Sequence, residues 1–183
     1  MTMKAVKLYS SAIMLLALAG SGCASSAAQG DGAAEPASGG GKAAPEITAS
    51  FVVGDGPKSI SEAKGKVVIV DFWATYCDPC KKSFPKYQEL VDQFGGDLAV
   101  IAVSVDEPGD VGEDKLKEFA NETGVKFPIL WDKDHKTADL YKPPNMPTSY
   151  VLDKEGNIRH VHAKYESGEE AKIADEVRKL LGQ

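Results

Sequence analysis

The sequence predicts an α/β domain, in which a mixed central β-sheet is flanked by helices, preceded by a stretch of different composition. Three observations predict this class. Two continuous runs of β-branched and other apolar residues, at 66–73 and 97–106, are typical of strands buried on both faces. Segments with helical spacing follow each of these runs. The chain then ends in two short strands and an amphipathic helix, a combination that places helices on both faces of one sheet.

Each further element has its own signal. Asp78 and Pro79 can begin a helix, because proline in the first turn gives up a hydrogen bond that a helix lacks there. That helix should run to about Phe94, pass through Pro85, which should kink it, and stop at two glycines. The later signals predict a helix at 113–124, a strand at 127–131, a short helix at 135–141, two strands within 148–163 joined by a turn at 153–156, a closing helix at 168–182, and a small hairpin within 47–65.

The first 22 residues are typical of a secretory signal peptide. Lys4 and Lys7 precede an apolar run at 8–19, and small residues follow it. The run is too short for a transmembrane helix, which needs roughly 20 apolar residues. The exit "AGSGC" resembles the lipobox of bacterial lipoproteins, although Gly20 replaces the usual large aliphatic residue. This resemblance implies that Cys23 is acylated and that the protein is anchored to a membrane by lipid. Ordinary cleavage nearby is the alternative.

Residues 23–46 are predicted to be a flexible linker. From Ala24 onward the segment is rich in Ala, Gly and Ser and has no large apolar side chain, so it cannot bury enough surface to fold. Such a linker reaches roughly 25 Å, enough to hold a domain just off a membrane surface. Because Ala24 rather than aspartate follows Cys23, the resemblance to lipoproteins implies an outer-membrane destination. The folded domain is therefore expected at 47–183.

The charge excludes one class of partner. The 183 residues carry a net charge of −6. A chain this acidic has no positive field to attract phosphates, so nucleic-acid binding is not expected.

Two cysteines three positions apart, Cys77 and Cys80 in "WATYCDPCKKSFP", allow several chemistries. Haem attachment needs a histidine directly after the second cysteine, where Lys81 stands. A zinc site needs a second ligand pair. His160 and His162 could supply it, but we expect them on the exposed face of an edge strand. A purely structural disulfide would gain little, because the loop that it closes is so short.

Redox chemistry agrees with every local feature. Cys77 would lie at the N-terminus of a helix, where the helix dipole and free backbone N–H groups favour the thiolate. Cys80, one turn along and less exposed, could attack a mixed disulfide formed at Cys77. Lys81 and Lys82 add positive charge nearby.

The stretch "DFWATYCDPCKKSFP" resembles the active site of thioredoxin-fold proteins, specifically the membrane-tethered TlpA/ResA type of thiol-disulfide oxidoreductase. The resemblance covers nearly all of 47–183. It implies that Cys77 is the nucleophile and that Cys80 resolves the intermediate. It also assigns the family's cis-proline to Pro147 in "NMPTSYVLD". The 67 positions between Cys80 and Pro147 suit the extra strand and helix of the tethered type.

Further roles follow from the resemblance. Asp71 corresponds to the buried acid that relays a proton to the resolving cysteine, and burial should raise its pKa toward neutrality. A partly exposed aspartate at the end of a strand is the alternative. Trp73 either shields the disulfide or is a core residue. The residues expected to contact the substrate are Trp73, Tyr76, Pro79, Met146, Pro147 and Thr148.

The sequence departs from the family at three positions. Tyr76 stands where the family usually has tryptophan. Ser83 replaces an acidic residue that is common after the second cysteine. Ala102 stands where simple thioredoxins have a lysine that pairs with the buried acid, so Asp71 is expected to have a different pKa from theirs.

The expected function is reduction of protein disulfides outside the cytoplasm. Asp78 places a negative charge beside the Cys77 thiolate, which should destabilise the reduced form and lower the reduction potential. The resemblance implies protein thiols as partners, including apocytochrome c before haem attachment, and a membrane electron donor that re-reduces the disulfide. It implies no cofactor and no metal.

Two alternatives use the same fold. A peroxidase of the peroxiredoxin kind needs a threonine three residues and a proline seven residues before its reactive cysteine, where Ala74 and Val70 stand. A Sco-like copper-binding module uses cysteines four apart with a distant histidine, for which His160 or His162 would have to serve.

Overall fold

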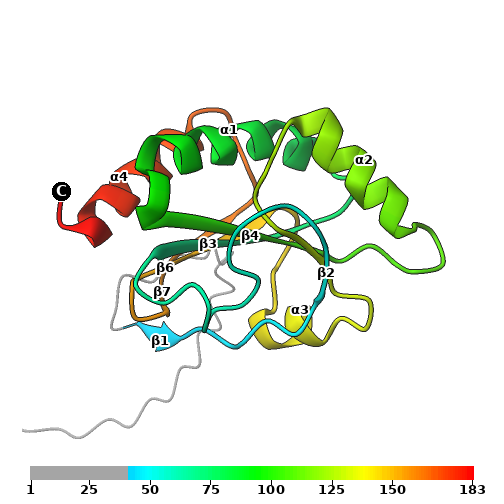
Figure 1. Ribbon diagram of the computed structural model, residues 1–183, viewed down its shortest axis with the longest axis horizontal. Helices are drawn as coiled ribbons and strands as arrows, with labels where there is room; N and C mark the ends of the chain where they lie inside the picture. Colours follow the sequence, from blue (N-terminus) through cyan, green and yellow to red (C-terminus); the bar gives the residue numbers. More distant parts are fainter. Residues whose placement is uncertain (1–40) are drawn as a thin grey trace, which may run out of the picture. The chain divides into compact units, whose positions relative to one another are not determined.

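A seven-stranded sheet runs through the computed structural model, which describes residues 41–183 (Figure 1). The predicted signal peptide, the predicted lipidation site Cys23 and most of the predicted linker lie outside the described residues. The elements are β1 (Lys42–Ala43), β2 (Ser50–Val53), β3 (Val67–Trp73), α1 (Asp78–Phe94), the 3-10 helix η1 (Gly95–Asp97), β4 (Leu98–Ser104), α2 (Glu113–Thr123), β5 (Ile129–Trp131), α3 (Lys136–Tyr141), β6 (Thr148–Leu152), β7 (Asn157–Ala163) and α4 (Glu169–Leu181).

The sheet is mixed, as predicted. Its strand order is β1-β7-β6-β3-β4-β5-β2. β3 pairs in parallel with β4, and β4 with β5, whereas β6 is antiparallel to β3. Every residue of β3 and β4 is buried, which explains why both strands read as continuous apolar runs. The two central strands, β3 and β4, therefore form the buried centre of the sheet, next to the residues that make up the candidate site.

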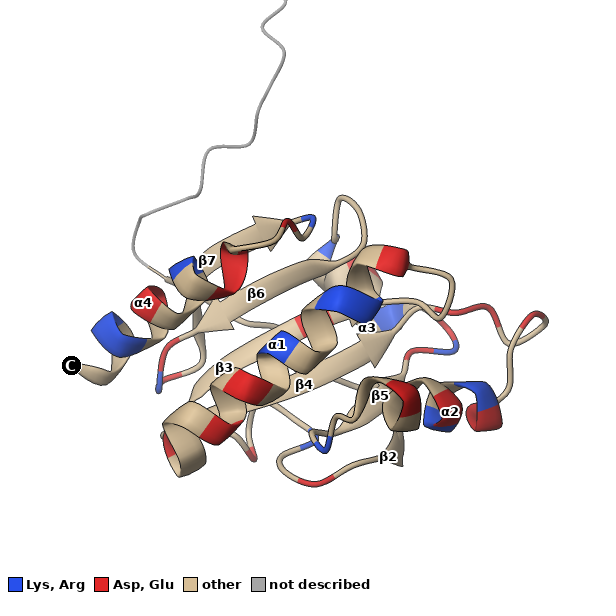
Figure 2. Ribbon diagram, turned by 90° about the horizontal axis from the view of Figure 1, so that it is seen from above, with Lys and Arg blue, Asp and Glu red and all other residues tan. Residues whose placement is uncertain are grey.

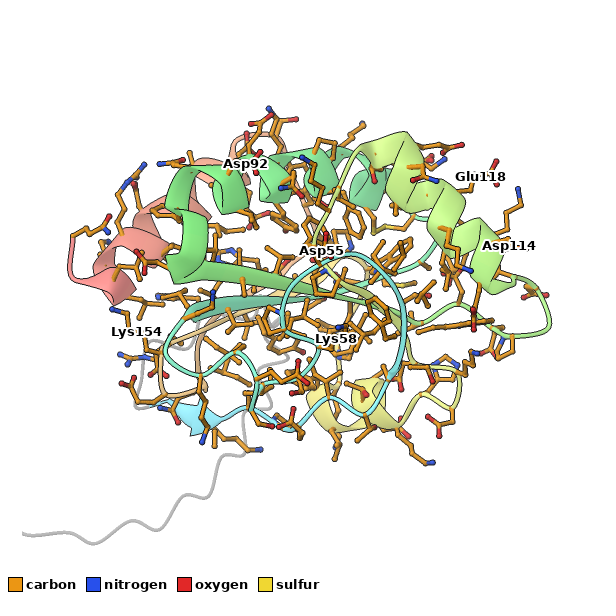
Figure 3. The ribbon with its side chains drawn as sticks, in the orientation of Figure 1. Asp55, Lys58, Asp92, Asp114, Glu118 and Lys154 are labelled. Carbon is orange, nitrogen blue, oxygen red and sulfur yellow. A yellow bond between two sulfur atoms is a disulfide. The ribbon has the colours of Figure 1, made fainter. Side chains whose placement is uncertain are left out.

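Helices cover both faces of this sheet, and each face has its own apolar core. α1, α2 and α4 lie on one face and α3 on the other (Figure 1). Seen from above, α1 crosses β3 and β4 while α4 lies over β6 and β7 (Figure 2). Alternate residues of β3 enter the two cores: Ile69 and Trp73 pack beneath α1, and Val70 and Phe72 pack on the α3 side. Charged side chains such as Asp92, Asp114 and Glu118 stand on the outer surfaces of the helices (Figure 3).

The N-terminal segment differs from the prediction in two ways. The expected hairpin is wrong, because β1 pairs with β7 and β2 pairs with β5, at opposite edges of the sheet. The ordered structure also begins before residue 47. β1 extends the sheet, and the Glu46 carboxylate accepts hydrogen bonds from the backbone N–H groups of Ile60 (2.7 Å) and Ser61 (3.1 Å). Open sheet edges attract such pairing even where the side chains are small.

The segment between β4 and β6 contains the expected additional elements. α2 and β5 stand between β4 and α3, and β5 joins the sheet beside β4. The β6–β7 turn is built around Asp153, whose carboxylate accepts from the backbone N–H groups of Glu155 and Asn157. Gly156 completes the turn at a φ of 84°, a conformation that side chains disfavour. In residues 41–183 no helix combines the length and apolar character needed to cross a membrane.

Candidate active site

Cys77 and Cys80 form a disulfide at the start of α1, with their Cα atoms 5.3 Å apart. Cys77 is the N-cap of the helix, and its Sγ atom lies 3.2 Å from the backbone nitrogen of Cys80, which donates to it. Cys77 is 7% exposed and Cys80 is fully buried. A thiolate formed at Cys77 would therefore sit where the N–H groups of the first helical turn converge and the helix dipole is positive.

The loop that presents Cys77 is held by a buried carboxylate, that of Asp106. This residue follows β4 and is 1% exposed. Its oxygens accept from the Thr75 backbone nitrogen (3.0 Å), the Thr75 hydroxyl (2.7 Å) and the Ser104 hydroxyl (2.8 Å). The Asp106 carbonyl in turn accepts from the indole nitrogen of Trp131 (2.8 Å). Charge-assisted hydrogen bonds of this kind fix the backbone two residues before the cysteine.

Asp71 is fully buried in β3, on the face that lies under α1. Its Oδ1 atom accepts a hydrogen bond of 2.5 Å from Ser149, and its Oδ2 atom has no hydrogen-bond partner within residues 41–183. Burial raises the pKa of Asp71 to about 7, and the Ser149 hydroxyl opposes that rise. The carboxyl can therefore gain and lose a proton near neutral pH. Ala102 stands opposite Asp71 in β4, so no lysine charge faces it from that strand.

The loop before β6 lies beside the cysteine loop. The Met146–Pro147 peptide bond is cis, as the resemblance implied. Met146 packs against the core cluster that contains both cysteines. Tyr76 and Met146 also line one groove of about 520 Å³, which extends to the start of α3. Tyr76 is 72% exposed at its rim. Across the groove, His135 Nε2 lies 2.9 Å from Glu107 Oε1.

Three of the six residues expected to contact substrate, Trp73, Pro147 and Thr148, are buried. Trp73 is fully buried, with its ring centroid 4.9 Å from that of Phe84 and 4.3 Å from that of Phe119. Thr148 is also fully buried, and its hydroxyl donates to the Asn145 carbonyl. Both end or begin central strands, where packing takes the side chain into the core. Tyr76 and Pro79 are exposed, Met146 is half-buried and Pro147 is buried.

The charged residues next to the cysteines are exposed. Lys81 is 4.0 Å from Glu122 of α2, and Asp78 is exposed in the first turn of α1. An exposed pair at this distance contributes little to stability. Ser83 is buried and donates to the carbonyl of Cys80, so this position supports the second cysteine without adding a charge.

The expectation of exposed histidines on β7 is wrong for His162. This residue is 5% exposed, because α4 covers its face of the strand. Its Nδ1 atom lies 3.0 Å from Glu169 and its Nε2 atom 2.7 Å from Glu176, while His160 is 3.5 Å from Glu176. Both ring nitrogens of His162 are therefore engaged by carboxylates. Within residues 41–183 no cluster of three or more His, Cys, Asp and Glu side chains is arranged to hold a metal ion.

Three residues of the site were missed from the sequence. Ser149 and Tyr87 continue from Asp71, with a distance of 2.7 Å between their hydroxyl oxygens. The helical spacing of Cys80, Phe84 and Tyr87 could have placed Tyr87 on the same buried face as the cysteine. Asp106 could have been found because the carboxyl ends of neighbouring parallel strands meet at one edge of a sheet, where sites form.

Comparisons with known proteins agree with this geometry. The AhpC/TSA family model matches residues 40–161. The thioredoxin-like protein YneN of Bacillus subtilis is 36% identical over 122 residues, 67% of this chain and 70% of that protein. The thiol-disulfide oxidoreductase ResA of Bacillus anthracis is 38% identical over 122 residues, 64% of this chain and 66% of that protein. The chain thus spans about two thirds of the length of these relatives.

Solved structures are similar over more of the chain. A putative thiol:disulfide interchange protein DsbE from Chlorobium tepidum superposes with a TM-score of 0.68 at 26% identity, covering 78% of this chain and 97% of that one. A thioredoxin-like protein solved in its oxidised form gives a TM-score of 0.67 at 28% identity, covering 78% and 96%. The central sheet and its helices are therefore those of a thioredoxin-like fold.

Proposed function

This chain belongs to the AhpC/TSA family and is an oxidoreductase of the thiol-disulfide type, and on this premise we propose that it reduces protein disulfides outside the cytoplasm. The observation that carries the proposal is the Cys77–Cys80 pair at the N-terminus of α1, with one sulfur at the helix cap and the other buried. Cys77 is the nucleophile and Cys80 the resolving residue.

The chemistry proceeds in two steps. The Cys77 thiolate attacks one sulfur of a substrate disulfide, the substrate S–S bond breaks, and the first substrate thiolate takes a proton from water. Cys80 then gives its proton to the Asp71 carboxylate and attacks Cys77, so the mixed disulfide breaks and the second substrate thiolate leaves. The substrate has gained two electrons, and the Cys77–Cys80 disulfide has formed. A dithiol donor, which we place in the membrane, restores the reduced form.

The substrate approaches over the exposed end of this site. Tyr76, Pro79 and Met146 have accessible surface there, and Pro147 contributes its backbone. The resemblance to the TlpA/ResA type supports protein thiols as substrates, among them the cysteines of apocytochrome c before haem attachment.

The location rests on the sequence before residue 41. The basic start, the apolar run at 8–19 and the following Cys23 support export and a lipid anchor. The residue after Cys23 supports an outer-membrane destination. Labelling of the expressed protein by a fatty acid, lost in Cys23→Ser, tests the anchor. A protein that is exported but carries no lipid would contradict it.

The direction of electron flow is tested by the reduction potential of the Cys77–Cys80 pair, with Cys77→Ser as the control that cannot form the disulfide. Asp78 beside the thiolate supports a potential near that of thioredoxin, about −270 mV. A value near −120 mV, typical of a strong oxidant, would make the protein a disulfide donor and contradict the reductase. Cys80→Ser should trap a mixed disulfide with substrate at Cys77, whereas Cys77→Ser should trap none.

The same preparations separate the alternatives. A peroxidase would consume hydrogen peroxide at a rate abolished in Cys77→Ser. The positions where such a peroxidase needs threonine and proline hold Ala74 and Val70, which are both buried in the core. A copper module would bind copper at a stoichiometry lost on changing His160 or His162. Neither result is expected.

A further inference from the structure

A chain of buried hydroxyls ends on the Asp71 carboxyl. Tyr87 lies on α1, Ser149 on β6 and Asp71 on β3, and none of the three is more than 1% exposed. The Ser149 Oγ atom is 2.5 Å from Asp71 Oδ1 and 2.7 Å from the Tyr87 hydroxyl oxygen. Because Ser149 gives its only hydroxyl proton to the carboxylate, Tyr87 must donate to Ser149. Both donors therefore point toward Asp71.

The phenol keeps its proton over the working pH range. Burial, and after it the charge of Asp71, raise the pKa of Tyr87 well above its usual value. Tyr87 is therefore a permanent donor, and Ser149 can turn toward only one acceptor. The second oxygen of Asp71, Oδ2, has no hydrogen-bond partner among the residues that the structure describes, so it can carry the transferred proton.

The surroundings of Asp71 contain few other charges. Across β4 it faces Ala102. From α1, Cys80 and Tyr87 belong to the cluster beneath the helix. Beyond Ser149, the next residue in the same row of the sheet is His162 on β7, which is bonded to Glu169 and Glu176 of α4. The Tyr165 ring lies 6.5 Å from that of Tyr87.

We propose that Ser149 and Tyr87 are positioning residues for the resolving step, which together orient Asp71 and stabilise its anionic form so that it can accept the proton of Cys80. This inference rests on the proposed relay through Asp71. In that step the S–H bond of Cys80 breaks and its proton moves to Asp71. The sulfur's electron pair forms the bond to Cys77, the bond between Cys77 and the substrate sulfur breaks, and the substrate leaves as a thiolate. Ser149 and Tyr87 keep their own protons throughout.

The hydroxyls make a specific prediction for the carboxyl. A hydrogen bond to a charged group favours that charge, so Ser149→Ala should leave the anion less stable and raise the titration midpoint of Asp71 by about one pH unit. Tyr87→Phe should raise it by less, because Ser149 still donates. In the double variant Tyr87→Phe should add nothing, since Tyr87 acts only through Ser149.

The experiment is a ¹³C NMR titration of the reduced, purified protein with carboxyl-labelled aspartate. The Asp71 signal is assigned as the one missing in Asp71→Asn, so titration of His162 does not enter the readout. Tyr150→Phe is the matched control, because Tyr150 is also buried on β6 and its hydroxyl donates to the Tyr141 carbonyl on the other face of the sheet. The rate at which Cys80 resolves a preformed mixed disulfide is followed over the same pH range.

We expect the titration midpoint of Asp71 to rise more in Ser149→Ala than in Tyr87→Phe and to stay unchanged in Tyr150→Phe. The pH profile of the resolution rate should shift by the same amount as the midpoint. An unchanged midpoint in both Ser149→Ala and Tyr87→Phe would overturn the inference and leave the reductase proposal standing. If Ser149→Ala does not fold, an unchanged midpoint in Tyr87→Phe alone overturns the role of the chain. If Asp71→Asn leaves the pH profile of resolution unchanged, the relay itself is wrong and the inference falls with it.

Discussion

Asp71 is the ionisable side chain of β3, and every other residue of that strand is apolar and buried. A charge in such a place is costly, since burial disfavours the ionised form. In the described part of the chain, one hydroxyl donor opposes that cost, and the second carboxylate oxygen has no partner. An apolar residue at this position would make the protein more stable. The carboxyl lowers the free energy of unfolding but provides a group whose pKa is about 7.

Replacing this carboxyl should therefore stabilise the protein. The pKa of Asp71 is raised from 3.8 to about 7 on folding, so its contribution to stability is best below pH 3.8 and becomes a penalty as the pH rises through 7. At about 1.4 kcal/mol per pKa unit, Asp71→Asn should gain roughly 2–4 kcal/mol at pH 8 and little near pH 4. Urea unfolding at the two pH values measures this. A gain of equal size at both would show that the charge is not the cause.

Asp106, unlike Asp71, should stabilise the protein, because both oxygens of its buried carboxylate accept hydrogen bonds. Asp106→Ala should leave the Thr75 amide and two hydroxyls without partners and cost about 3 kcal/mol. It should also speed hydrogen exchange of the Thr75 and Tyr76 amides, which precede Cys77. Thr123→Ala is the comparison and should leave those amides protected, because it removes only a half-buried hydroxyl that donates to the Phe119 and Ala120 carbonyls at the end of α2. Exchange unchanged by Asp106→Ala would contradict its role in the loop.

At the scale of elements, α4 is joined to the sheet by charge as well as by apolar contact. Ile173 and Val177 pack in the core beneath the helix. From the same helix, Glu169 and Glu176 contact the two ring nitrogens of His162 on β7. Burial alone would lower the pKa of His162, but its bond with Glu176, and then that with Glu169, raise it above the usual value. The same bond lowers the pKa of Glu176 against the effect of burial.

The docking of α4 should accordingly depend on pH. His162 has a raised pKa in the folded state, so its stabilisation is complete below pH 6.5 and is lost as the pH rises through that raised value. Glu176→Gln should cost about 3 kcal/mol at pH 6, because it leaves a buried charge with half its partners, and clearly less at pH 9. Glu89→Gln, in an exposed pair with Lys86, should change stability by less than about 1 kcal/mol at either pH. Urea unfolding of both variants measures this, and a cost for Glu176→Gln that grows with pH would refute the assignment.

At the scale of the whole molecule, the N-terminal segment connects the two edges of the sheet. β1 adds to β7 at one edge, and β2 adds to β5 at the other. Between them, Glu46 binds the backbone at Ile60 and Ser61. Edge strands with open hydrogen-bonding groups invite association with other chains, and this segment covers part of both edges.

Truncation should reveal the contribution of that segment. A chain that starts at residue 47 lacks β1 and Glu46, so it should be less stable than a chain that starts at residue 41, by about 1–3 kcal/mol. Urea unfolding of the two chains measures the difference, and Glu46→Gln in the longer chain isolates the share of the carboxylate. Equal stability of the two chains would restore residue 47 as the start of the domain.

Local patterns predicted most of this molecule, and long-range pairings account for the failures. The strands and helices from β3 to α4, the cysteine pair and the cis-proline follow from continuous apolar runs, helical spacing or the resemblance. The partners of β1 and β2 could not be predicted, because two-residue and four-residue strands carry no signal of which edge they join. The burial of His162 and the hydroxyls at Asp71 depend on which helix covers which strand. No local pattern contains that information.

The pairing of β1 places the N-terminal end of the described chain at the opposite end of the sheet from Cys77. β1 lies against Asn157 and Ile158, where β7 begins; that end is level with Leu152 and hence with Val68, the start of β3. Cys77 follows the opposite end of β3, about 17 Å away along the strand. The chain ahead of Gly41 joins the domain at the end of the sheet opposite Cys77. An anchor of the kind proposed at Cys23 would therefore leave the end that carries Cys77 accessible to a protein substrate.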